Sequence, residues 1–494
     1  MDRVKFWRGV PCSRHLLGGV SLLVCSSMLL PQCNPGGLDA QDFVLLSENG
    51  FDASDHDDDN NEYAWSMRYF RPDGDKSGTV YVGTGNNISG IFTYYAEANL
   101  SGGETDNPPV LPPEIRRHRP DLGEDVWEKV LDYRDIDDDL KTYGFRSMIV
   151  YDAESETQKG ALTSYLYAGS QGVDGSTLWR SSTGDAGTWE SVFTSGPNSA
   201  SMRALAVHDG KLYVGFAFDA LAMENPPAAE IWVSENGVGF EPVMQDGFGD
   251  PNNRAVEFLM PFDGWLFAGT KNDVDGYEVW KLDGPGDQDE PVQVVDNGGP
   301  DSRNESAGTA FVFKEKLYVG SLIFYGYNRI QNNGFKGCDI IRIDTDDSWE
   351  TVVGPRSVSG YNSGFNYFTN AYCWQFEEHD GWLYTGTFDQ ATLLAGLLDN
   401  LPAIIALLQE QNQKAALGEF LDFDDWMRLM EGGGDIFKTQ DGENWFRITS
   451  DGLGNRGNYG WRTMESTPDG HLYLGSANPT NGLEIWRTVE PLEE

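Results

Sequence analysis

The chain has 494 residues, a formal net charge of −43, 39% hydrophobic residues and 58 glycines. A charge this negative argues against nucleic acid and anionic membrane surfaces as partners, because both select basic proteins. The many glycines and the ordinary hydrophobic content are typical of a turn-rich all-β protein with a large core.

Residues 1–40 are predicted to be an export signal and leader. A basic start is followed by an apolar run over 16–30, which is too short to span a bilayer comfortably. We expect cleavage after Ala40, because neither Cys25 nor Cys33 follows the small residue that lipoprotein processing requires. The protein is therefore expected to be secreted, periplasmic or on the cell surface, without an integral membrane span.

An isolated strand and an acidic run follow the leader. Residues 43–50 align without a gap on 240–247 and on 445–452, which read as outer strands with their turns. The acidic run contains Asp55, Asp57, Asp58 and Asp59, whose carboxylates are hard ligands suited to calcium. Since the run lacks the ordered spacing of a calcium loop, we favour a solvated acidic loop, keep calcium as the alternative, and expect no other cofactor.

One short pattern recurs along the rest of the chain. It is a β-branched or aliphatic residue, an aromatic residue, a small apolar or polar residue and glycine, as in Val80-Tyr81-Val82-Gly83. The seven copies begin at Val80, Leu166, Leu212, Leu266, Leu317, Leu383 and Leu472. The closest glycine spacings, Gly169 to Gly215 and Gly269 to Gly320, suit a four-stranded propeller blade.

The flanks of the copies complete the blade. Several copies follow an Asp-Gly turn, a strong hairpin signal, as at 209–210, 263–264, 380–381 and 469–470. Two further short runs follow each copy, except that the last copy lacks the final run. The sequence therefore predicts an all-β seven-bladed β-propeller over 41–494, in which residues 43–46 supply the missing outer strand of the last blade.

Two blades are interrupted between their second and third strands. Residues 94–111 are a loop rich in Gly, Asn and Pro, and residues 389–432 have the apolar spacing of two or three amphipathic helices. Loops at this position share a face with the connections between blades, so both insertions should lie near the channel mouth. They serve either as a cap that seals the ring or as a lid or partner-docking element.

Candidate site residues lie on the innermost strands. Counting back from the hairpin turns places Arg146 and Arg203 at one level with Glu257 and Trp374, and Arg462 joins them if its turn is one residue longer. Guanidinium groups match carboxylates in bidentate geometry. These five residues are the ligand-binding candidates; the competing interpretation is that acids of neighbouring blades pair the arginines and tie the ring together.

Asparagines and cysteines complete the inventory of polar positions. Asn253, Asn304, Asn370 and Asn458 precede innermost strands and are expected to bond local backbone. Cys338 and Cys373 are either a disulfide, as export permits, or two buried thiols. Cysteine and histidine are too sparse for a zinc site.

Two turns resemble the Asp-box turns of sialidase-like (BNR-type) propellers. They are Ser182-Thr183-Gly184-Asp185-Ala186-Gly187-Thr188-Trp189 and Lys438-Thr439-Gln440-Asp441-Gly442-Glu443-Asn444-Trp445, and Asp347-Ser348-Trp349 is a shortened version. The resemblance covers turns only, with a spacing that departs from the usual box. It implies a propeller in which these turns are structural and lie on the far side from the active site. Sialidases use an arginine triad, a tyrosine–glutamate pair and an acidic residue. This sequence offers candidates for the arginines and does not place the other parts.

The sequence therefore predicts a secreted or surface-associated propeller that acts as a binding or scaffold module for an extracellular glycan, another anionic ligand or a protein. The alternative is a sialidase-like, glycan-active hydrolase or lyase with its site at the channel mouth. A carboxylate pair facing the arginines across an open pocket would favour the enzyme, and a channel plugged by the helical insertion would favour the scaffold.

Overall fold

The computed structural model describes twelve stretches of the chain: 36–52, 61–88, 90–91, 110–136, 141–154, 160–173, 175–196, 201–217, 227–284, 290–323, 336–392 and 432–489. The chain divides into two units, Met1–Gly36 and Gly37–Glu494, and the second holds nearly all described residues. The acidic run 55–59, nearly all of the expected helical insertion at 389–432 and most of the expected loop at 94–111 lie outside them.

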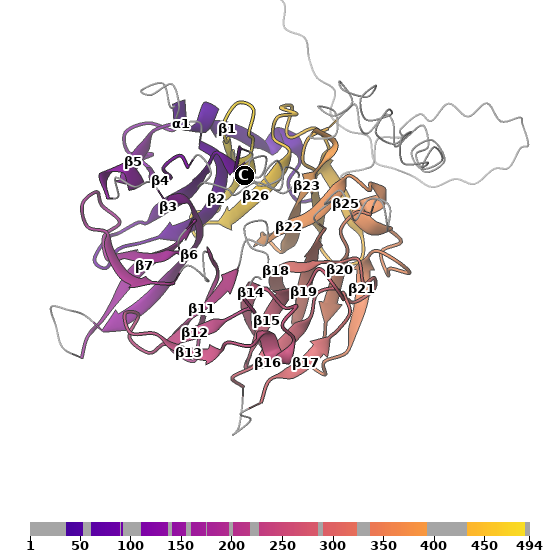
Figure 1. Ribbon diagram of the computed structural model, residues 1–494. Coiled ribbons are helices and arrows are strands. Elements are labelled where there is room, and N and C mark those ends of the chain that lie inside the picture. Colours follow the sequence, from indigo (N-terminus) through magenta and orange to yellow (C-terminus); the bar gives the residue numbers. More distant parts are fainter. Residues whose placement is uncertain are drawn as a thin grey trace, which may run out of the picture. The chain divides into compact units, whose positions relative to one another are not determined.

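The strands form a closed all-β propeller. They pair antiparallel within one 28-stranded sheet, in groups of four that we call blades, and each blade begins with its innermost strand. The innermost strands are β2 (Asn61–Phe70), β6 (Thr142–Glu154), β10 (Ser201–His208), β14 (Ala255–Phe262), β18 (Ser306–Phe313), β22 (Asn370–His379) and β26 (Gly460–Ser466). Figure 1 shows these strands around the centre of the ring.

The repeated pattern forms the second strand of each blade. These strands are β3 (Thr79–Asn86), β7 (Leu162–Gly172), β11 (Lys211–Ala217), β15 (Trp265–Lys271), β19 (Lys316–Leu322), β23 (Trp382–Asp389) and β27 (Leu472–Ala477). They are buried on both faces because blades pack on either side of them, so that Leu317, Tyr318 and Val319 are all almost fully buried.

The two outer strands of each blade are shorter. The third strands are β4 (Glu114–His118), β8 (Thr177–Ser181), β12 (Ile231–Ser234), β16 (Val279–Leu282), β20 (Ile340–Ile343), β24 (Ile436–Thr439) and β28 (Ile485–Thr488). The outermost strands are β5 (Trp127–Asp132), β9 (Glu190–Thr194), β13 (Glu241–Met244), β17 (Val292–Val295), β21 (Trp349–Val353), β25 (Trp445–Thr449) and β1 (Phe43–Ser47).

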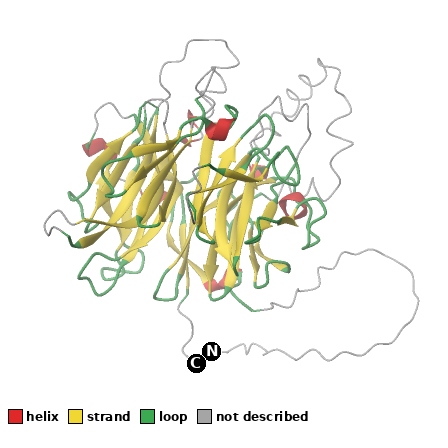
Figure 2. Ribbon diagram, turned by 90° about the horizontal axis from the view of Figure 1, so that it is seen from below, coloured by secondary structure: helices red, strands yellow, loops and turns green. Residues whose placement is uncertain are grey.

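Helical structure is minor within the described residues, as Figure 2 shows. It comprises the one-turn α1 (Asn49–Asp52), the short 3-10 turns η1 (Ala40–Asp42), η2 (Tyr133–Asp135), η3 (Gly247–Gly249) and η4 (Ser363–Asn366), and the helical residues 88, 90–91 and 391–392. In this part of the chain no helix combines the length and apolarity that a membrane crossing requires.

The N-terminal strand completes the last blade, as predicted. Strand β1 lies antiparallel to β28, with Phe43 opposite Thr488 and Leu45 opposite Trp486. The ring then closes where Tyr63 of β2 pairs with Ala477 of β27. Both ends of the propeller unit are therefore held in one blade, which leaves no unpaired third strand at the C-terminal end.

The repeat glycine allows the next blade to approach closely. A Cβ atom added at Gly386 would lie 2.5 Å from the Cβ of Trp461, and one at Gly215 would lie 2.6 Å from Cγ1 of Val256. Both partners belong to the innermost strand of the following blade. The repeat therefore requires glycine for packing between blades, in addition to its place in the strand.

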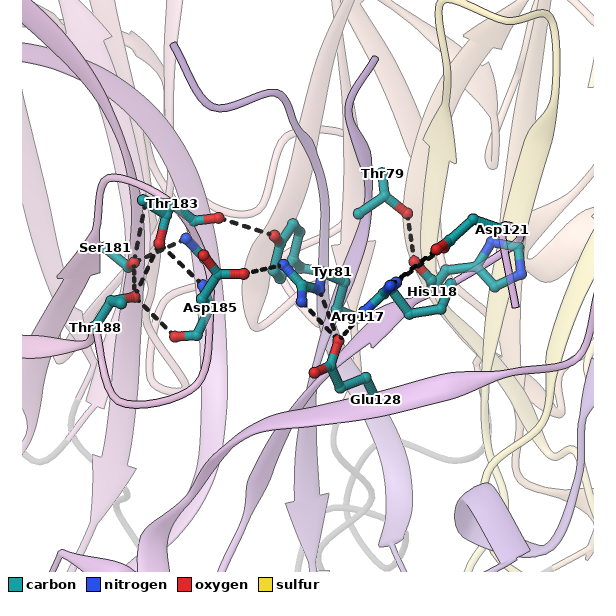
Figure 3. A network of polar contacts seen from close by, with 12 residues as sticks. Thr79, Tyr81, Arg117, His118, Asp121, Glu128, Ser181, Thr183, Asp185 and Thr188 are labelled. Carbon is teal, nitrogen blue, oxygen red and sulfur yellow. Dashed lines mark hydrogen bonds and ion pairs between the residues drawn. The ribbon is translucent and has the colours of Figure 1, made fainter. Parts of the chain in front are cut away.

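A second recurring contact, which we call the inter-blade contact, joins the repeat tyrosine and a cation of the third strand to the next blade. In Figure 3, Arg117 of β4 donates to Asp185 in the β8–β9 turn over 2.7 Å and to Glu128 of β5 over 2.6 Å. The Tyr81 hydroxyl donates to the Thr183 carbonyl of the same turn over 3.5 Å. This turn is one of the Asp-box-like sequences, and its contacts here are structural.

The inter-blade contact recurs at the last junction with a different partner. Since β1 and β28 are chain ends, no turn connects them. Instead, the Leu38 amide donates to the Tyr384 hydroxyl over 3.2 Å, and Lys438 donates to the Leu38 carbonyl over 2.6 Å. Leu38 lies in the stretch that we assigned to the leader, and the second compact unit runs from Gly37 to Glu494.

Two smaller expectations were resolved by the structure. Cys338 and Cys373 form a disulfide that joins the blade of β18 to the blade of β22. The asparagines bond local backbone as predicted: Asn253 donates to the Gly247 carbonyl and Asn370 to the Gly364 carbonyl, over 2.9 and 3.1 Å. Each asparagine also donates to a carboxylate that precedes the third strand of its blade, Asn253 to Glu278 and Asn370 to Asp435. These bonds tie the start of the first strand to the start of the third.

Candidate functional site: the channel of the propeller

Every innermost strand contains a β-bulge at the same level. On each innermost strand, one residue at this level has no partner on the second strand of its blade. This residue immediately precedes the one that lies opposite the repeat glycine. A bulge leaves the extra residue outside the ladder and re-aims its side chain. The skipped residues, which we call the bulge ring, are Trp65, Arg146, Arg203, Glu257, Gly308, Trp374 and Arg462.

The bulge ring contains all five residues that the sequence placed at one level. Arg462 belongs to it because its hairpin is one residue longer than the two-residue hairpins that follow β10, β14, β18 and β22. Thr467 bonds His471 across three intervening residues, whereas His208 pairs with Lys211 across two. The two residues that the count missed are Trp65 and Gly308.

The side chains of the bulge ring associate in pairs from neighbouring blades. Arg203 forms an ion pair with Glu257, and both side chains are less than 10% exposed. The Arg146 guanidinium lies 5.1 Å from the Trp65 ring centre, and the Arg462 guanidinium lies 5.4 Å from that of Trp374. Contacts of this kind stabilise a cation by about 0.5–2 kcal/mol, less than full pairing with a carboxylate in a buried site.

The three arginines differ in how well their hydrogen bonds are satisfied. Arg203 has the carboxylate of Glu257. Arg146 donates to neutral acceptors, the side chains of Gln171 and Ser201. Arg462 has no ion pair and no hydrogen bond within the described residues, although it is 9% exposed and its Nε is fully buried.

The electrostatics of Arg462 reflect this lack of an anion. Burial and, to a lesser extent, the positive charge of Arg203 lower the pKa of Arg462 to about 9, against the opposing effect of Glu257. A guanidinium whose charged form is this unfavourable is a site where an added carboxylate gains both charge compensation and two hydrogen bonds. Of the candidate residues, Arg462 is therefore the one best suited to hold an anion.

Aromatic side chains pack together on one side of the bulge ring. Tyr63 contacts the hydroxyl of Tyr459, and its ring lies 6.0 Å from that of Trp374, two blades away. Tyr143 and Phe388 belong to the same buried cluster. Residues between second and third strands, such as Ile88 and Ile91, belong to the same cluster. This side of the bulge ring is therefore the one that we expected to be the channel mouth.

A pair of glutamates lies on the other side, three residues beyond the bulge ring on two adjacent strands. Glu377 follows Trp374 on β22, and Glu465 follows Arg462 on β26. Glu465 accepts the Tyr69 amide over 2.8 Å and lies 3.4 Å from Arg68, while Glu377 accepts the Ser466 amide over 3.4 Å. Each glutamate therefore bonds the channel-facing edge of the next innermost strand.

Both carboxyl groups have a raised pKa. Burial and the negative charge of Glu465 raise the pKa of Glu377 to about 8, against the charge of Arg68. Burial also raises the pKa of Glu465, where Arg68 and the Tyr69 amide oppose the shift. The pair was not predicted because only one level of the innermost strands was compared; the available signal was an acid three residues after the bulge residue, which among the seven innermost strands only β22 and β26 have.

Metal binding receives no support from the described residues, which contain no group of three or more histidine, cysteine or acidic side chains able to hold a metal ion. The calcium candidates Asp55, Asp57, Asp58 and Asp59 lie outside them.

Comparison with known proteins gives only distant structural likenesses. No protein-family model matches the chain, and no curated protein matches it in sequence. It is similar to a prolyl endopeptidase (12% identity, TM-score 0.39), with 88% of this chain matched to 51% of that one, about half its length.

Two glycan-active enzymes show the same degree of likeness. One is the α-L-arabinanase of Penicillium chrysogenum (13% identity, TM-score 0.37, 72% of this chain and 94% of that one). The other is the GH93 α-L-arabinofuranosidase of Fusarium graminearum (12% identity, TM-score 0.36, 70% and 93%). At these scores the likenesses carry no argument about activity, so function must be argued from the channel itself.

Proposed function

We propose that this chain is a secreted or surface-associated seven-bladed β-propeller that binds a carboxylate-bearing ligand, an acidic glycan, in its channel. The four-stranded groupings of the sheet support the blade count. The observation that carries the function is Arg462, a buried guanidinium without an anion or a hydrogen-bond partner in the described part of the chain.

The physical argument is one of compensation. A buried cation that lacks acceptors is costly, and replacing the missing acceptors removes that cost. A ligand carboxylate at Arg462 would accept two hydrogen bonds in the plane of the guanidinium and would also lie in the field of Arg203. Trp374 and Trp65 present aromatic surface on the same level.

A binding screen tests the proposal. Isothermal titration calorimetry of the full chain with trigalacturonate and sialyllactose should give binding, while neutral xylotriose should give much weaker binding. Arg462→Lys keeps the charge but removes the fork, so affinity for the acidic sugars should fall at least tenfold. The matched control is Arg303→Lys, since Arg303 pairs with Asp301 at the surface.

Two results would contradict the proposal. Equal affinity of acidic and neutral sugars would show that the carboxylate is not what the channel recognises. Unchanged binding by a folded Arg462→Lys variant would show that Arg462 has a structural role, as the scaffold interpretation requires.

A further inference from the structure

The bulge ring and the glutamate pair lie along the same two strands. Glu377 lies three positions after Trp374, and Glu465 lies three positions after Arg462. Three positions correspond to about 10 Å of extended chain. The aromatic cluster lies on the opposite side of the bulge ring. A ligand held by Arg462 therefore has packed aromatics on one side and two carboxyl groups on the other.

The two carboxyl groups differ in what surrounds them. Glu465 has a cation, Arg68, and a backbone amide at 2.8 Å, both of which favour its ionised form. Glu377 has one long amide contact and faces the negative charges of Glu465 and Glu378, with Arg68 as the opposing cation. A carboxyl pair whose environments separate the two protonation states is the arrangement that acid–base catalysis uses.

We propose that Glu377 is the proton donor and Glu465 the base of a glycoside-cleaving pair that acts on the acidic sugar held at Arg462. Glu377 gives its proton to the glycosidic oxygen as the bond from that oxygen to the anomeric carbon breaks. Water adds to the anomeric carbon, and its proton passes to Glu465, so the products contain one added water. Proton exchange with solvent then restores both carboxyl groups.

This inference rests on the proposed binding of an acidic glycan at the bulge ring, which supplies the positioning. Arg68 is a positioning residue here, because it holds the carboxylate of Glu465 and does not contact the sugar. The pair also distinguishes the enzyme from a simple lectin-like propeller, since binding alone gives no reason to hold a protonated carboxyl beside an ionised one.

Turnover of trigalacturonate and sialyllactose by the full chain, measured as released sugar from pH 5 to 9, tests the proposal. Glu377→Gln and Glu465→Gln should each lower the rate at least a hundredfold. Glu315→Gln is the control, because Glu315 is exposed in the turn between β18 and β19 of another blade, and it should leave the rate unchanged. Wild-type activity should fall as the pH rises through about 8, where Glu377 loses its proton.

The outcomes separate catalysis from binding. Calorimetric binding of both sugars without any turnover would overturn the catalytic proposal and leave the binding function intact. Loss of binding and of turnover in Arg462→Lys, together with turnover by the wild type, would support the binding proposal and the catalytic proposal. If Glu377→Gln did not fold, the wild-type pH profile would decide, and activity maintained to pH 9 would overturn the role of Glu377.

Discussion

Arginines at the inter-blade contacts and the arginine in the channel are in opposite electrostatic situations. At the inter-blade contacts, Arg117 of β4 and Arg342 of β20 each bond one acid of their own blade and one acid of the next blade. Hydrogen bonds to these acids and to the repeat tyrosine raise the pKa of both arginines in spite of burial. In the channel, burial and Arg203 lower the pKa of Arg462. The difference shows that the chain pairs its structural cations with acids from the next blade, which makes the unpaired channel arginine a site for something else.

Removing the segment that closes the ring should have the largest effect. Deletion of residues 36–50 removes β1 and the Leu38 contact, so β28 becomes an exposed edge and Tyr384 loses its partner. We expect a melting temperature lower by ten degrees or more, in proportion to a loss of several kcal/mol, and association through the open edge. Calorimetry and size-exclusion chromatography check this, and an unchanged, monomeric protein would contradict it.

A repeat glycine tests packing between blades independently of charge. Gly386→Ala places a methyl group 2.5 Å from the Cβ of Trp461, so it should cost about 1–3 kcal/mol of unfolding free energy. The matched control is Gly196→Ala, because a Cβ at Gly196 meets nothing within 4 Å. Chemical denaturation measures both, and equal stability of the two variants would show that the blades can move apart without cost.

Neutralising each kind of arginine sharpens the comparison directly. Arg342→Met removes bonds to Glu350 and Glu443, which are themselves about half exposed, so it should cost about 1 kcal/mol. Arg462→Met removes an uncompensated buried charge and should be neutral or slightly stabilising. Urea denaturation of both variants is the measurement; a larger loss in Arg462→Met would mean that the channel arginine is already compensated.

The pH dependence of stability gives the smallest expected effect. The folded state raises the pKa of Glu377 above the ordinary 4.5, so its stabilising contribution is complete below about pH 4.5 and is lost as the pH rises through about 8. Glu377→Gln should therefore gain stability relative to wild type between pH 5 and pH 9. The difference should widen progressively as the pH rises from 5 to 8, and parallel unfolding curves across this range would contradict the shift.

The sequence predicted the elements better than their contacts. The repeat located the second strands, and the gapless alignment of residues 43–50 located β1, because both depend on local spacing. Counting from the hairpin turns also placed the five channel candidates at one level. The bulges themselves were not predicted, because a bulge is a mismatch of register between two strands and leaves no composition signal in either.

The spacing of residues along the sequence could not predict which side chains of neighbouring blades contact each other. Nothing in the sequence indicates that Arg203 pairs with Glu257 while Arg462 lies against Trp374, since that depends on which neighbouring side chains turn toward the channel. The role of Leu38 was hidden for a similar reason. It follows a segment that we expect to be an export signal, and only the structure shows that it takes the place of a missing turn.

If the expected leader is cleaved, the contacts of Leu38 link that cleavage to the assembly of the ring. A peptidase that cut after Ala40 would leave β1 in place but would remove the amide that bonds Tyr384 and the carbonyl that bonds Lys438. A cut upstream of Gly36 would retain both. The position of such a cut would therefore determine whether the junction between the blades of β22 and β26 is complete, and N-terminal sequencing of the mature chain would show which form is made.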